Sequence, residues 1–128
     1  MEPIPQISES ELTLMKIIWK NEDSALYANI MEQLKNKGFD WKKNTVLTFL
    51  SRLVDKKLLA ISKIGRRNDY KALVSEAEYQ AGQTKHFVDK IYDGNMTGLV
   101  NMLVNGDLIA EKDIAELRAF WEGSKHHE

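Results

Sequence analysis

Apolar residues recur at the three- and four-residue spacing of amphipathic helices through the first third of the chain. Ser8 followed by Glu11 forms a capping box, so a first helix is predicted from there to about Lys20. A second helix is predicted from about Ser24 to Gly38, because glycine readily adopts the left-handed conformation that ends helices. The apolar stripes of the two helices are Leu12, Met15, Ile18 and Trp19, then Ala25, Leu26, Ile30, Met31 and Leu34.

A third helix followed by a β-hairpin is predicted next. The helix should run from about Asn44 to Lys57. Two β-type runs, residues 58–62 and 70–74, flank a Gly-Arg-Arg-Asn-Asp turn, which is the pattern of a hairpin. Three helices and then a hairpin is the order of a winged helix-turn-helix, so residues 1–74 are predicted to form such a domain. The expected fold class is therefore mainly α, of the α+β type.

Three further helices are predicted after the hairpin. Ser75 with Glu78 is a second capping signal, opening a helix to about Tyr92, and Gly94 breaks it. These helices are short and have wide apolar faces that so little chain cannot bury alone. We therefore expect residues 75–128 to form a helical dimerisation region, with a small monomeric bundle as the alternative. The predicted dimerisation residues are Phe87, Ile91, Met96, Leu99, Val100, Leu103, Leu117, Phe120 and Trp121.

Positive charge is concentrated in residues 41–71. This stretch contains nine of the eighteen Lys and Arg residues and only two acidic residues, whereas the whole chain has a formal net charge of −1. A basic island in an otherwise acidic chain is typical of a nucleic-acid contact surface. A solvated basic face without a partner would give the same charge run. The positions of the residues on the predicted elements are therefore needed to choose between the two interpretations.

That layout favours DNA. Thr45, Thr48, Arg52 and Lys56 recur along the polar side of the third helix, where hydroxyls can reach phosphates and arginine can bind guanine. Two lysines precede that helix, where the helix dipole already attracts phosphate. Cations at the hairpin tip suit a wing in a minor groove, although charge can also protect an edge hairpin from aggregation. The predicted DNA-binding residues are Lys42, Lys43, Thr45, Thr48, Arg52, Lys63, Arg66 and Arg67.

The remaining chemistry argues against an enzyme. Cysteine is absent, which excludes disulfides, thiolate catalysis and cysteine-based zinc sites. The sequence has no Gly-rich phosphate loop, HExxH or GxSxG pattern, so no catalytic residue, metal site or cofactor is predicted. His86 has no His or carboxylate partner at i±4, and His126 and His127 lie in a charged tail. No apolar run is long enough to span a membrane, so we expect a cytoplasmic protein without membrane insertion.

Three stretches of the chain match one known family in register: ISESELTLMKIIW, WKKNTVLTFLSRLVDKKLL and FVDKIYDGNMTGLV. They resemble the opening, the recognition-helix segment and the "F-x-x-x-x-Y-x-G" helix end of the BlaI/MecI penicillinase-repressor family of bacterial winged-helix transcription regulators. The later stretch DIAELRAFW extends the resemblance over almost the whole chain.

The resemblance implies a homodimer that binds a dyad-symmetric operator and represses β-lactam-resistance genes. Its carboxyl-terminal helices would interlock as the dimerisation domain. The resemblance also implies release by cleavage in that domain, triggered by a membrane sensor with a zinc metalloprotease domain. On this register the family's cleavage bond falls at Met102–Leu103, with Asn101–Met102 one residue earlier, so Asn101, Met102 and Leu103 are the candidate cleavage residues.

The chain departs from the family pattern in the recognition segment. Asn44 replaces a lysine of the family, and Leu47 stands where arginine is often found, which removes one DNA contact and leaves the operator sequence open. The absence of cysteine sets aside the copper-responsive mechanism of a related branch. Two alternatives remain: a repressor released by a small ligand between its carboxyl-terminal helices, and a winged-helix module that binds an acidic protein.

Overall fold

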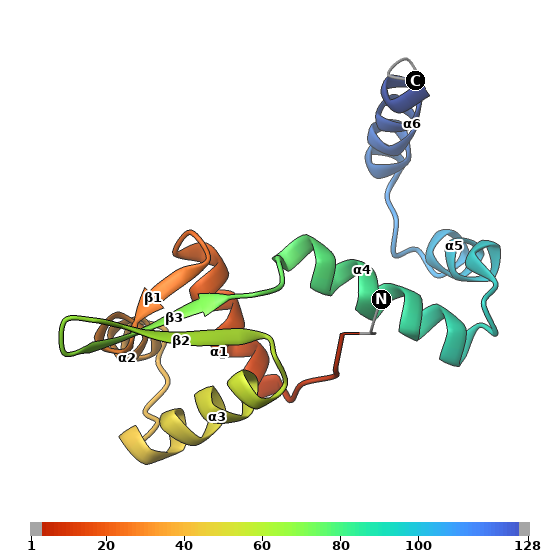
Figure 1. Cartoon of the computed structure of the whole chain (residues 1–128). Helices are drawn as coiled ribbons and strands as arrows, with labels where there is room; N and C mark the ends of the chain where they lie inside the picture. The colour runs from red at the N-terminus through yellow and green to blue at the C-terminus, as the bar shows by residue number, and fades with distance from the viewer. Residues whose placement is uncertain (1–3, 126–128) are drawn as a thin grey trace. The chain divides into compact units, whose positions relative to one another are not determined.

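The structure is a computed structural model that describes residues 4–125 (Figure 1). It divides into two compact units, Met1–Gln83 (the N-terminal unit) and Thr84–Glu128 (the C-terminal unit). His126 and His127 lie outside the described residues. The elements in chain order are α1 (Glu9–Lys20), β1 (Ser24–Leu26), α2 (Tyr27–Asn36), α3 (Lys43–Asp55), β2 (Leu59–Ile64), β3 (Arg67–Ala72), α4 (Glu76–Ile91), α5 (Met96–Asn105) and α6 (Glu111–Lys125).

Both predicted capping boxes form. At α1 the Glu11 amide donates to Ser8 Oγ at 3.2 Å, and the Ser8 amide donates to Glu11 Oε1 at 2.9 Å. At α4 the Ser75 and Glu78 groups make the same two bonds, at 3.1 and 3.0 Å. These reciprocal bonds satisfy amides that have no partner within the helix, which explains why the sequence signal located both helix starts.

The second helix begins later than the sequence predicts. Residues 24–26, expected in its first turn, form strand β1, which pairs antiparallel with β3 (Ala25 opposite Tyr70). The ladder supplies backbone hydrogen bonds from a segment far away in sequence, and such partners are invisible to local periodicity. The end of the helix was placed correctly, because α2 stops at Asn36 and Gly38 has the expected positive φ of 87°.

The sheet has three antiparallel strands in the order β1-β3-β2. The hairpin ladder runs from the Leu59–Ala72 pair to the Ile64–Arg67 pair, leaving a two-residue loop of Gly65 and Arg66. The five-residue turn predicted from Gly65 onward is therefore too long, because pairing continues nearly to the tip. Gly65 has a φ of 66°, a conformation that glycine adopts without strain.

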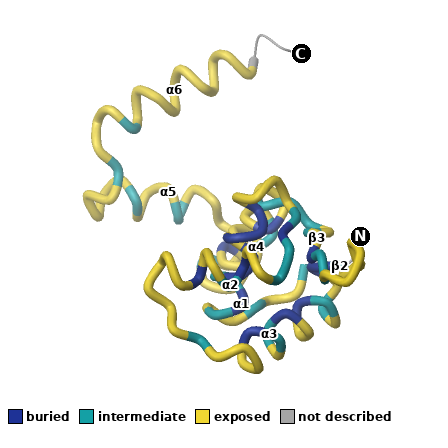
Figure 2. The backbone as a smooth tube through the Cα atoms, turned by 90° about the vertical axis from the view of Figure 1, so that its left-hand side faces the viewer, coloured by how far each residue is buried: buried dark blue, intermediate teal, exposed yellow. Residues whose placement is uncertain are grey.

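The core of the N-terminal unit lies between its helices and the sheet. Buried positions follow α1 and α3 along one side each, as Figure 2 shows. The first turns of α4 also belong to this unit, since Trp19 Nε1 donates to the Val74 carbonyl at 2.8 Å and the Trp19 ring lies 5.6 Å from that of Tyr79. The core cluster comprises Leu14, Met15, Ile17, Ile18, Trp19, Ala25, Ile30, Leu34, Val46, Leu50, Leu53, Leu58, Leu59, Tyr70 and Tyr79.

The C-terminal unit has little core of its own. No residue from 89 to 124 is buried, and α5 and α6 are almost entirely exposed (Figure 2). Asn95 caps α5 by accepting from the Gly98 amide at 3.0 Å, so the helices themselves are well formed. None of the helices in the described part of the chain is both long and apolar enough to cross a membrane.

Candidate nucleic-acid interface

Helix α3 presents one apolar and one polar side. Val46, Leu50 and Leu53, at i, i+4 and i+7, are fully buried. Thr45 and Thr48 lie on the other side and are exposed, together with Arg52. Burial of the first stripe therefore fixes which way the second stripe faces, and that second stripe is available to a groove of DNA.

Contacts within α3 orient two of its exposed polar side chains, Thr48 and Arg52. Thr48 Oγ1 donates to the Asn44 carbonyl at 2.9 Å, which directs its remaining lone pairs outward as acceptors. The Arg52 guanidinium carbon lies 6.0 Å from the centroid of the Phe49 ring. Such a cation–π contact orients the guanidinium without using its hydrogen-bond donors.

The start of α3 is strongly electropositive. Lys42 is the N-cap residue without a side-chain cap bond, Lys43 is the first helical residue, and the first turn has no acidic side chain. Unpaired amides and the helix dipole add to these two exposed charges. Trp41 packs just before them, with its ring 5.0 Å from Phe39 and 5.5 Å from Phe49. Trp41 is therefore a packing residue.

Lys56 does not continue the polar stripe. Helix α3 ends at Asp55, and the Lys56 ammonium lies 3.1 and 3.2 Å from the two carboxylate oxygens of Glu11. It also donates to the Gln6 carbonyl at 3.3 Å. The sequence interpretation was wrong here, because helical spacing places Lys56 on the exposed side, whereas a buried carboxylate holds its side chain.

Glu11 is ionised in this setting. Burial alone would raise the pKa of its carboxyl group. The Ser8 amide and the Lys56 ammonium, helped by the Ser8 hydroxyl, stabilise the charged form and outweigh burial, so the pKa lies below its ordinary value. The sequence reasoning gave Glu11 only a capping role and missed its ion pair with Lys56. A signal was present, since Glu11 shares the helical spacing of the buried Leu14, Met15 and Ile18.

The three predicted wing cations are all exposed but do not share one face. Lys63 pairs across the hairpin with Asn68, and Arg67 pairs with Ile64. Side chains of successive pairs point to opposite faces of a hairpin, so Lys63 and Arg67 lie on different faces. Arg66 occupies the loop at the tip.

The predicted dimerisation residues lie on α4, α5 and α6. Leu99 and Leu103 are half-buried, and the others are exposed. Exposure is greatest on α6, where Phe120 is 79% and Trp121 is 64% exposed. The candidate cleavage residues Asn101, Met102 and Leu103 all lie inside α5.

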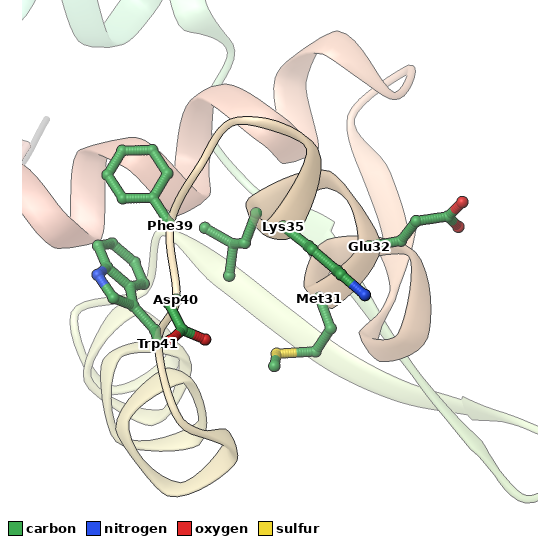
Figure 3. Close-up of a pocket in the computed structure, with 7 residues that line it drawn as sticks. Met31, Glu32, Lys35, Phe39, Asp40 and Trp41 are labelled. Atoms are coloured by element: carbon green, nitrogen blue, oxygen red, sulfur yellow. The ribbon is translucent and has the colours of Figure 1, made fainter.

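A surface hollow with a volume of about 460 Å³ lies at the connection between α2 and α3 (Figure 3). Its charged side chains are two carboxylates and one ammonium, and its lining contains no serine, threonine, cysteine or histidine. No cluster of three or more metal-ligating side chains occurs in residues 4–125. The hollow is lined by Met31, Glu32, Leu34, Lys35, Phe39, Asp40 and Trp41.

Comparisons with known proteins agree with this architecture. Two solved structures resemble the N-terminal part at 38% identity, each covering 62% of this chain and 94% of the other. They are the DNA-binding domain of the repressor BlaI, with a TM-score of 0.53, and the monomeric form of Bacillus licheniformis BlaI in complex with the blaP half-operator, with a TM-score of 0.52. The predicted winged-helix fold is thereby confirmed.

The similarity of sequence extends over nearly the whole chain. The penicillinase repressor of Bacillus licheniformis is 32% identical over 126 residues, which cover 98% of this chain and 97% of that protein. The methicillin resistance regulatory protein MecI of Staphylococcus aureus (strain N315) is 30% identical over 113 residues, or 88% of this chain and 90% of that one. The family model described as penicillinase repressor matches residues 7–123. The chain therefore belongs to the penicillinase repressor family.

Proposed function

We propose that this protein is a homodimeric transcriptional repressor that occupies a dyad-symmetric operator and so blocks a promoter. The observation that carries the proposal is the polar face of α3, where Thr45, Thr48 and Arg52 are exposed opposite a fully buried apolar stripe. Lysines at the start of α3 and cations on the wing extend this face with positive charge. The relative bound to a half-operator shares 38% of its residues with this chain over the same part.

Dimerisation through residues 75–128 accounts for the C-terminal helices. Exposed large apolar side chains occur on α4, α5 and α6 together, including Ile91, Val100 and Leu117 at more than half exposure each. A monomer rarely leaves so much apolar surface in water. A second copy would cover it and would set the spacing of two winged-helix heads on DNA. A separate monomeric bundle is the competing interpretation of the same residues.

Release of the operator by proteolysis is the proposed induction step. The candidate bonds, Asn101–Met102 and Met102–Leu103, lie in the middle of α5. A protease needs extended backbone, so cleavage requires local opening of this helix. A membrane sensor and protease pathway would supply the signal, and β-lactam-resistance genes would be the regulated targets.

The deciding experiment is selection of binding sites from a random pool of duplex DNA. It uses the full chain at a physiological ionic strength of about 0.15 M. We expect enrichment of a sequence with two-fold symmetry, with half-sites spaced by about one helical turn. Sedimentation of the same protein should show a dimer. Enrichment of no sequence would contradict the repressor assignment, and enrichment of single half-sites by a monomer would contradict the dimer.

A small ligand held between the C-terminal helices is the alternative release mechanism. A thermal-shift screen with β-lactams and metabolites separates the two routes, because only ligand release predicts a direct shift of the melting temperature. A module that binds an acidic protein would show salt-sensitive retention on any duplex without selecting a symmetric sequence.

A further inference from the structure

A buried ion pair lies at the carboxyl end of α3. Glu11 is 2% exposed and is the one charged residue among the buried positions of the described chain. Its partner Lys56, whose side chain is 34% exposed, follows directly on the last residue of α3. A buried carboxylate is costly without a partner, so this contact fixes the end of α3 against the first turn of α1.

Two more segments of the N-terminal unit meet at this pair. The Lys56 ammonium holds the Gln6 carbonyl of the amino-terminal arm. That arm continues onto α4, where a Cβ placed on Gly82 would lie 3.5 Å from Ile4 Cδ1. Burial raises the pKa of Tyr79 on α4, and the negative charge of Glu11, which lies within electrostatic range, raises it further. The end of α3, the start of α1, the arm and the start of α4 are therefore joined around one ion pair.

We propose that Glu11 and Lys56 are positioning residues for operator recognition, which hold α3 at the angle that its DNA contacts require and do not touch DNA themselves. This inference rests on the proposed function. Arg52 lies one helical turn before Lys56, so a change in the tilt of the helix end displaces its guanidinium directly. Hydrogen bonds to base edges tolerate only small errors of distance and angle, which makes such a displacement costly for affinity.

The salt dependence of binding separates positioning from direct contact. Each phosphate contact contributes about 0.9 to the slope of log affinity against log salt. In the full chain with its selected duplex, Lys56→Met should lower affinity about tenfold. Its salt slope should stay that of the unaltered protein. Lys43→Met, at the start of α3, should lower the slope by about one. Lys16→Met, on the exposed side of α1, removes the same charge as a control and should change neither quantity.

Glu11→Gln should change DNA affinity in opposite directions, depending on whether Lys56 positions α3 or binds phosphate itself. Glutamine keeps the oxygen that accepts from the Ser8 amide but removes the charge that holds Lys56. If Lys56 bound phosphate, freeing it and removing a negative charge would raise both affinity and slope. Positioning predicts a loss of affinity with an unchanged slope, and Lys56→Arg, which keeps the ion pair, should retain most of the binding.

Three results would overturn the inference: a lower slope in Lys56→Met, unchanged affinity in both variants, or tighter binding by Glu11→Gln. Circular dichroism under the assay conditions should show folded protein, and if Lys56→Met fails this check, Glu11→Gln and Lys56→Arg decide. Failure of the unaltered chain to select any duplex would instead contradict the proposed function.

Discussion

Lys63 and Arg67 lie on opposite faces of the β2–β3 hairpin, although both are exposed cations close to its tip. Lys63 pairs with Asn68, in the same alternating set as the Leu59–Ala72 and Ile61–Tyr70 pairs. Leu59 and Tyr70 are buried in the core cluster, so Lys63 lies on the face of the hairpin that continues from the helical core. Arg67 shares its face with Ile64, away from the helical core.

This geometry predicts unequal roles for the two wing cations. We expect a duplex bound to α3 to contact the helix-facing side of the wing, so Lys63→Ala should lower the salt slope of binding by about one. Arg67→Ala removes an equal charge from the other face and should have a clearly smaller effect. Binding measured at several salt concentrations checks both, and equal slopes for the two variants would show that the face of the hairpin does not matter.

The Arg52 side chain should contribute to operator affinity through the planar shape of its guanidinium and not through its charge alone. Arg52→Ala is expected to weaken operator binding by roughly 1–3 kcal/mol if the side chain makes a bidentate base contact. Arg52→Lys keeps the charge but removes the two-pronged hydrogen-bond donor and the cation–π contact with Phe49. It should therefore weaken binding almost as much as Arg52→Ala does.

Binding of the two Arg52 variants to the selected duplex and to single-base variants of it checks this prediction. Relaxed discrimination at one position of each half-site is the expected sign of a base contact. A lysine variant that binds as the unaltered protein does would reduce Arg52 to a phosphate contact.

Acid should destabilise the N-terminal unit through Glu11. Its pKa in the folded state lies below the ordinary value of 4.5 that it regains on unfolding. The stabilisation is therefore complete above the ordinary value and is lost as the pH falls through the lower, folded-state pKa. Glu11→Gln should cost about 1–3 kcal/mol near neutral pH, less than for a fully buried pair because water reaches Lys56.

Urea unfolding of Glu11→Gln between neutral pH and pH values below 4.5 measures this linkage. The variant should show a flatter loss of stability in acid than the unaltered protein. Glu78→Gln is the matched comparison: the Ser75 amide and hydroxyl also lower the pKa of Glu78 in the same capping box at α4, but Glu78 is exposed, so its variant should flatten the profile less. A Glu11→Gln profile parallel to that of the unaltered chain would contradict the assigned role of the carboxylate.

The winged-helix domain should need the start of α4. The sequence places the domain boundary after Val74, but Tyr79 is 7% exposed and its ring packs on Trp19. A chain ending at Gln83 should therefore be more stable than one ending at Val74, by about 2–4 kcal/mol from aromatic burial and pairing. Chemical denaturation compares the two.

Sedimentation of the same two fragments tests the dimer assignment, because both lack all of the predicted dimerisation residues and should be monomers. Equal stability would support a boundary at residue 74, and a dimeric fragment would place the dimer contacts in the winged-helix domain.

The sequence by itself determined the local features of this protein. Capping boxes at Ser8 and Ser75 located two helix starts, Gly38 marked the end of α2, and the spacing of Thr45, Thr48 and Arg52 indicated which side of α3 faces outward. All of these depend on interactions within a few residues, where spacing along the chain equals position in space.

Only the tertiary structure decided the features that depend on distant partners. Strand β1 exists because Ala25 meets Tyr70, and Lys56 leaves the polar stripe because a buried Glu11 lies beside it. The separation of Lys63 from Arg67 follows from the hairpin register, which a turn one or two residues longer would change. In each case the deciding free energy comes from hydrogen bonds or burial between segments far apart in sequence. The local sequence pattern does not indicate which of these segments will come into contact.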